Sequence, residues 1–130
     1  MLSEAFAKYG AKLKNVNWSV SAENERGELI LSLWQHYFEK PEGSAIKYVD
    51  RASRWSGNGN VEFKKRIEKA FQTNQVVRCV ISKTDNKASV DRGDDVSKLK
   101  NTFHVKEDWF GKVTLWDGDN IEIKFEIRKT

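Results

Sequence analysis

Cysteine and proline are nearly absent from this chain, which has one of each in 130 residues. A single cysteine, Cys79, cannot form an intrachain disulfide or a thiolate metal cluster, so the sequence excludes both. Its apolar surroundings in residues 77–81 predict a buried thiol on a strand. A free buried thiol is typical of a protein from a reducing compartment.

Long hydrophobic runs are also missing. No segment approaches the roughly 20 apolar residues that a bilayer-spanning helix needs. Residues 1–14 carry charges throughout and lack the apolar core of a secretory signal. We therefore expect a cytoplasmic protein that does not enter a membrane.

Familiar catalytic and metal-binding motifs are absent as well. The two histidines, His36 and His104, are not spaced as metal ligands, so we expect no bound metal. There is no nucleophile-elbow serine motif, no Walker motif and no dinucleotide-binding glycine pattern, and Gly57-Asn58-Gly59 is too short to count as either glycine motif. The sequence favours a binding protein over an enzyme, and it predicts no catalytic residue and no cofactor.

The chain does contain a slight excess of positive charge and many tryptophans. Its formal net charge is +4, from 23 basic and 19 acidic residues, and it has five tryptophans. This balance permits nucleic-acid contact through a local patch without requiring it. Exposed indole rings favour the same interpretation, because they are enriched at interfaces and can stack on bases.

Hydrophobic periodicity predicts both helices and strands. Apolar residues spaced by three and four predict helices over 3–14 and, after an N-cap at Asn60, over 61–73. Residues 17–22 and 28–38 predict a hairpin. The second of these strands is apolar on both faces, which is typical of a central strand covered on both sides.

Further strands are expected at 75–83, 112–116 and 121–128, and residues 45–49 are compatible with a short one. The turn residues 117–120 predict that the last two strands form a hairpin. Residues 84–101 are polar and have no regular pattern. This order predicts a single α+β domain over residues 1–130, with a mostly antiparallel, curved sheet of about five strands and two helices packed on it.

The strongest functional signal lies where the predicted loop meets the second helix. Two arginines three residues apart can each form bidentate hydrogen bonds with a phosphate, and a tryptophan beside them can stack on a base. Asparagines at the helix start can add hydrogen bonds, and lysines on the helix extend the positive field. The predicted nucleic-acid site comprises Arg51, Arg54, Trp55, Asn58, Asn60, Lys64 and Lys65. The alternative is that Trp55 closes the edge of the core and the glycines only turn the chain.

Aromatic residues on the predicted hairpin form a second group. They could line a pocket for a flat ligand such as a flipped base, or they could be ordinary core packing. The group comprises Trp18, Trp34, His36 and Tyr37.

A third pattern concerns nuclease chemistry. Glu122-Ile123-Lys124 has the E-x-K spacing of one class of metal-dependent nucleases, and strand alternation places Glu122 and Lys124 on one face. The upstream carboxylate would be Asp108, Asp117 or Asp119. The same spacing arises wherever a solvated strand face mixes charges, and Glu62-Phe63-Lys64 repeats it on a helix.

Two short strings carry a resemblance to a known family. Trp18-Ser19-Val20-Ser21-Ala22 and Leu31-Ser32-Leu33-Trp34-Gln35 resemble the W-S-W-G-A and L-x-V-W-Q-D strands of a bacterial family of small, largely uncharacterised proteins. Some members of that family occur with HNH-type restriction nucleases, so the resemblance implies a link to bacterial DNA-related or mobile-element biology. The chain departs from the pattern at Val20, Ser21 and His36. It also lacks the HNH motif, so no catalytic residue can be carried over.

A protein partner is the remaining alternative. Exposed aromatics and the charge-mixed segment 84–101 could together contact a larger bacterial machine. The sequence therefore allows a nucleic acid or a protein as partner, and it does not determine the oligomeric state.

Overall fold

The computed structural model describes residues 2–15, 19–54, 58–84, 88, 91 and 101–128. Within these residues, two α-helices and seven strands have defined bounds, together with two 3-10 turns. In chain order they are α1 (Leu2–Ala7), β1 (Ser21–Glu23), β2 (Leu29–Trp34), η1 (Gln35–Tyr37), β3 (Ala45–Arg51), η2 (Ala52–Arg54), α2 (Asn58–Thr73), β4 (Val77–Thr84), β5 (Asn101–Val105), β6 (Trp109–Trp116) and β7 (Asn120–Ile127).

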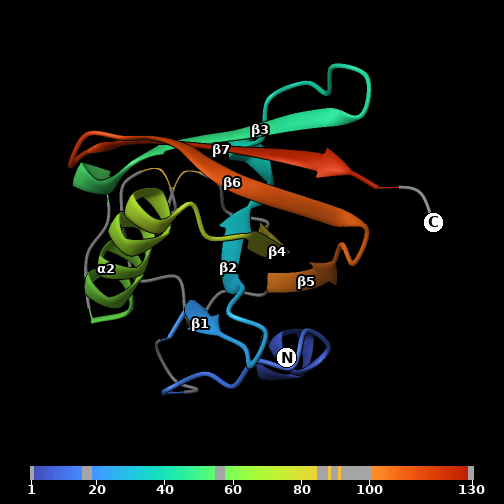
Figure 1. Cartoon of the computed structure of the whole chain (residues 1–130), viewed down its shortest axis with the longest axis vertical. Coiled ribbons are helices and arrows are strands. Elements are labelled where there is room, and N and C mark those ends of the chain that lie inside the picture. Colours follow the sequence, from blue (N-terminus) through green and yellow to red (C-terminus); the bar gives the residue numbers. More distant parts are fainter. Residues whose placement is uncertain are drawn as a thin grey trace.

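The strands form one sheet in the order β1-β2-β4-β6-β7-β3, with β5 also paired to β4. Every pair is antiparallel except β2 and β4, which run parallel with Leu29 opposite Val77. Figure 1 shows β3, β7 and β6 crossing β2 at a steep angle, so the sheet is strongly curved. The predicted α+β class and mostly antiparallel sheet are confirmed, but the sheet has seven strands instead of about five.

Strand alternation divides the interior into two clusters on opposite faces of the sheet. Leu31 of β2 and Cys79 of β4 face α2, whose buried residues belong to the larger cluster. The neighbouring residues Ile30 and Val80 face α1 and pack in the smaller cluster. The central position predicted for the 28–38 strand is therefore confirmed, because β2 is covered on both faces.

Helix α2 is amphipathic in the way its sequence predicts. Phe63, Ile67 and Ala70 are buried at spacings of four and three and face the larger cluster. The helix ends at Thr73 and is followed by a left-handed residue, Asn74, with a φ of 54°. The Gln75 amide then donates to the Ala70 carbonyl at 3.0 Å, a pattern common at helix ends.

Two elements are shorter than the sequence predicts. The first helix stops at Ala7, and the chain passes through Gly10 with a φ of 74°, which the helical pattern did not reveal. The 28–38 strand ends at Trp34, where the chain enters η1. The patternless segment 84–101 lies mostly outside the described residues, but it leads into a strand, β5, that we did not predict.

No helix among the described residues is both long and apolar enough to span a bilayer.

A nearly buried arginine links the central strand to the start of β6. Arg78 on β4 is only 6% exposed. Its Nε donates to the Trp109 carbonyl at 3.0 Å, and its Nη2 donates to the Glu107 carbonyl. Its guanidinium carbon lies 4.0 Å from the centre of the Phe110 ring, and Arg128 covers the same ring at 4.2 Å.

Glu28 completes this network at the β1–β2 turn. Its carboxylate accepts from Asn24 at 2.8 Å and Arg26 at 3.1 Å, and it lies 3.4 Å from Arg78. Burial alone would raise the pKa of Glu28, but the hydrogen bonds from Asn24 and Arg26 and the nearby charges outweigh it and hold the pKa below its usual 4.5. The ionised form therefore contributes to folded-state stability.

We predict that Arg78→Met lowers the free energy of unfolding by about 3 kcal/mol, because it leaves the carbonyls of Glu107 and Trp109 without this donor and removes one of the cations that contact Glu28. Urea unfolding followed by circular dichroism measures this. Arg128→Met is the matched control, since it removes the exposed cation from the same ring and should cost less than about 1 kcal/mol. Equal losses in the two variants would contradict the role assigned to Arg78.

We also predict a pH dependence from Glu28. A carboxyl with a lowered folded-state pKa stabilises the protein above its unfolded pKa and loses this contribution as pH falls through the folded one. The difference in unfolding free energy between the wild type and Glu28→Gln should thus be largest above pH 4.5 and shrink below it. Glu25→Gln, in the same turn, is the matched control for removing one acid. A difference that stays constant with pH would contradict the assignment.

Candidate functional site: an open cleft at the end of β3

The end of β3 is held by the tip of the β6–β7 hairpin. The Ala52 amide donates to the Asp119 carbonyl and the Ser53 amide donates to its carboxylate, each at 2.7 Å. The turn itself is fixed by Asp117, whose carboxylate accepts from the amides of Asp119 and Asn120. The Asn120 side-chain amide donates to the same carboxylate at 2.9 Å, and this hydrogen bond, together with the two backbone ones, holds the pKa of Asp117 below its usual value. The exit from β3 toward α2 therefore has a fixed position.

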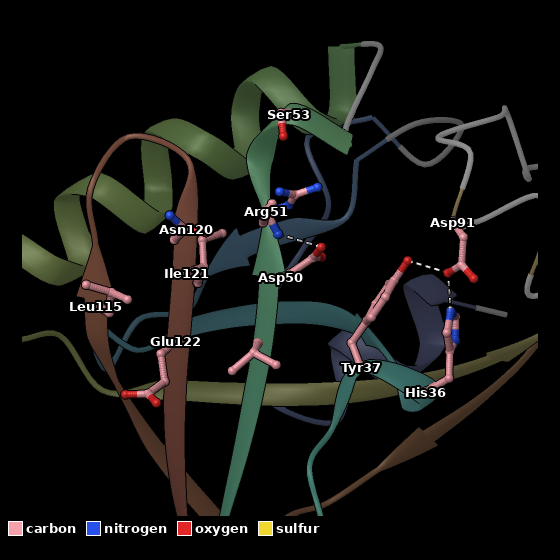
Figure 2. Close-up of a pocket in the computed structure, with 11 residues that line it drawn as sticks. His36, Tyr37, Asp50, Arg51, Ser53, Asp91, Leu115, Asn120, Ile121 and Glu122 are labelled. Carbon is pink, nitrogen blue, oxygen red and sulfur yellow. Dashed lines mark hydrogen bonds and ion pairs between the residues drawn. The ribbon is translucent and has the colours of Figure 1, made fainter.

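An open cleft of about 930 Å³ lies at this exit. Its walls come from η1, from β3 and its continuation, from the β6–β7 hairpin and from Asp91 (Figure 2). The lining residues are His36, Tyr37, Val49, Asp50, Arg51, Ser53, Asp91, Leu115, Asn120, Ile121 and Glu122.

Among the described residues that line the cleft, Arg51 is the one arginine. It pairs with Asn120 across the sheet and is exposed. Its backbone amide donates to the Asp50 carboxylate at 2.7 Å, and Asp50 also accepts from the Tyr48 hydroxyl at 2.7 Å. Within the described part of the chain, no carboxylate lies within ion-pair distance of the Arg51 guanidinium. This cation is thus available to an anion entering the cleft.

His36 and Tyr37 form the wall opposite β3. Both contact Asp91, whose Oδ1 lies 3.0 Å from His36 Nε2 and 2.5 Å from the Tyr37 hydroxyl that donates to it. The two rings lie 4.3 Å apart, and Tyr37 also meets Tyr48 edge-on at 6.4 Å. The Tyr37 ring is held on several sides and presents a fixed aromatic surface.

Carboxylates also line the cleft and oppose the charge of Arg51. Each of them accepts hydrogen bonds from the protein, as Asp50 and Asp91 do above. Glu122 accepts from the Thr114 hydroxyl at 2.6 Å and lies 3.7 Å from the Lys47 ammonium. These contacts reduce the negative field, but the three acids still weaken attraction for an anion.

The structure brings together residues from three separate sequence predictions. Arg51 comes from the predicted nucleic-acid site, His36 and Tyr37 from the predicted aromatic pocket, and Glu122 from the E-x-K pattern. None of the three patterns indicated that they share a cleft. Because β3 pairs with β7 and η1 follows β2, only the tertiary fold makes them neighbours.

Other predicted residues lie elsewhere. Trp34 is half-buried, with its ring 6.5 Å from that of His36, and does not line the cleft. Asn60, Lys64 and Lys65 lie on α2, where the two lysines are exposed, and they do not line the cleft either. Trp18 and Trp55, and the side chains of Arg54 and Asn58, lie outside the described residues.

The E-x-K residues Glu122 and Lys124 lie on one strand face, and each lies within ion-pair distance of a different residue. Lys124 lies 3.7 Å from Glu126, whereas Glu122 contacts Lys47 at the same distance. Asp117 and Asp119 are used in the hairpin turn, and the Asp108 carbonyl receives the Arg128 amide. The described ranges contain no group of three His, Cys, Asp or Glu side chains that could hold a metal ion.

The cleft also contains residues that our reading of the sequence missed. Asp50, Ser53, Asp91, Asn120 and Leu115 all line it. Asp50 and Ser53 were detectable, because both lie within two residues of Arg51 in the sequence. Asp91 was not, since its contact with His36 spans 55 residues.

Comparison with protein-family models, with curated proteins and with solved structures found no match to this chain. The resemblance of its two strand strings to a bacterial family therefore stays a prediction.

Proposed function

We propose that this protein is a non-enzymatic nucleic-acid-binding module that contacts phosphates at the cleft beside β3, with Arg51 as the central contact. One observation carries the proposal: Arg51 is exposed in an open cleft and has no carboxylate ion partner among the described residues. A guanidinium in this position suits a phosphate, which it can hold with two parallel hydrogen bonds.

Neighbouring groups support a longer contact. Lys64 and Lys65 are exposed on α2, the helix that follows the Arg51 turn, and would extend the positive field along a bound backbone. Arg54, Trp55, Asn58 and Asn60 stay part of this proposal on sequence grounds. Asn120 and Ser53 add polar groups in the cleft itself.

A protein partner is the second candidate function, and it is favoured by exposed apolar residues. Val61 and Phe71 on α2 are 56% and 42% exposed, which is high for residues of this size. A pull-down that survives nuclease treatment and is lost with Phe71→Ser but kept with Arg51→Ala would favour this candidate.

We predict that Arg51→Ala weakens binding to a short fluorescent DNA or RNA about five- to tenfold at low salt and reduces the slope of log affinity against log salt by about 1. Fluorescence anisotropy between about 50 and 200 mM salt measures both quantities. Lys12→Ala is the matched control, since this exposed lysine lies between residues that pack in the α1 cluster. Salt-independent binding, or no binding to any DNA or RNA, would refute the proposed function.

For the acidic residues of the cleft we predict the opposite effect, a gain in affinity for nucleic acid when one of them is neutralised. Glu122→Gln removes a negative charge from the lining and releases Lys47 from its 3.7 Å ion pair. Affinity for the same probe should therefore rise about two- to threefold at low salt, and the gain should disappear at high salt because screening removes it. An unchanged or weaker affinity would show that the phosphate does not pass near Glu122.

A further inference from the structure

We infer that the cleft selects single-stranded nucleic acid, with one phosphate at Arg51 and an unpaired base on each side of it. This inference rests on the proposed function and adds the class of nucleic acid. The main support for this inference is that Arg51 lies between two different surfaces of the same cleft, one aromatic and one aliphatic (Figure 2).

The aromatic surface is the ring of Tyr37. Figure 2 shows this ring standing between His36 and the β3 residues Asp50 and Arg51. His36 lies 4.3 Å from the ring, and Asp91 fixes the hydroxyl at 2.5 Å. An aromatic ring already held in place loses little conformational freedom when a base stacks on it, so it is well suited to bind unpaired bases.

The aliphatic surface is Leu115, on the hairpin side of Arg51. A register shift between Val113 and Leu115 marks a bulge in β6. Bulges re-aim side chains, and here Leu115 is left 44% exposed opposite Glu122, outside both core clusters. A half-exposed leucine at the mouth of a polar cleft is explained if it packs against the face of a base or sugar.

Base pairing is incompatible with this arrangement. In a duplex, consecutive bases are paired inward and stacked on one another, so they cannot also separate toward Tyr37 and Leu115. Separating two consecutive bases of a duplex requires unpairing and unstacking them, which costs a few kcal/mol. A strand that is already single-stranded avoids the cost of unpairing. Phosphate contact at Arg51 alone would tolerate either form, and the two flanking surfaces create the preference.

The test compares three ligands of equal length by fluorescence anisotropy with the full chain. They are a single strand, the same strand in a duplex, and an abasic strand that keeps the phosphates but has no bases. We expect the single strand to bind at least about tenfold more tightly than the other two, because stacking contributes to binding on top of phosphate contact. Parallel DNA and RNA sets show which sugar is preferred.

Two substitutions then locate the bases. Tyr37→Ala should weaken binding of the single strand about tenfold, and Leu115→Ala about threefold, with the abasic strand unaffected by either. Tyr37→Phe keeps the ring but loses the hydrogen bond to Asp91, so it should weaken binding of the single strand less than Tyr37→Ala does. Val61→Ala, which shortens an exposed apolar residue on α2, is the matched control for Leu115. If Tyr37→Ala fails to fold by circular dichroism, the exposed Leu115 still provides the test.

The outcomes separate this inference from the proposed function. Equal affinity for all three ligands, with sensitivity to Arg51→Ala, would overturn the single-strand inference and leave phosphate binding intact. Loss of binding to every ligand would overturn both. A preference for the single strand that neither Tyr37→Ala nor Leu115→Ala reduces would overturn the placement of the bases in this cleft.

Discussion

Arg78 places a positive charge inside the sheet, and the positions of several other elements depend on how that charge is satisfied. Removing a guanidinium from water costs several kcal/mol unless hydrogen bonds replace the lost solvent. Here the replacements are the carbonyls of Glu107 and Trp109 and the Glu28 carboxylate. These groups come from the β5–β6 turn, from the first residue of β6 and from the β1–β2 turn. One side chain on β4 therefore fixes where β6 begins and where the β1–β2 hairpin is anchored.

The consequence reaches the cleft through the β6–β7 hairpin. Because β6 starts beside β4 at a fixed point, Gly111 packs directly against Phe125 of β7, where an added Cβ would come within 2.6 Å of the ring. The hairpin then extends to its tip, where Asp119 holds the amides that follow β3. The position of Arg51 is thus determined from the opposite end of the hairpin by packing and hydrogen bonds.

Local sequence patterns predicted much of the fold and little of the site. The period of α2, the turn at residues 117–120 and the two-sided burial of β2 all follow from neighbouring residues, and the structure confirms them. The parallel pairing of β2 with β4 was not predicted, because no local pattern distinguishes parallel from antiparallel partners for an apolar strand. The short strand β5 was missed for a related reason. Its alternation of Phe103 and Val105 with exposed residues is brief and follows a polar segment.

Local sequence patterns also do not show which distant segments become neighbours, and this explains why three separate predictions fell on residues of one cleft. Arg51, Tyr37 and Glu122 each had a recognisable chemical role, but their proximity depends on β3 pairing with β7 and on η1 following β2. The edge of β3 also indicates how the cleft can recognise a ligand. Glu39 donates to the Lys47 carbonyl on that edge, and the Arg51 amide is already bonded to Asp50. These two backbone groups are therefore not open to an added strand, and in the proposed binding mode recognition rests on side chains.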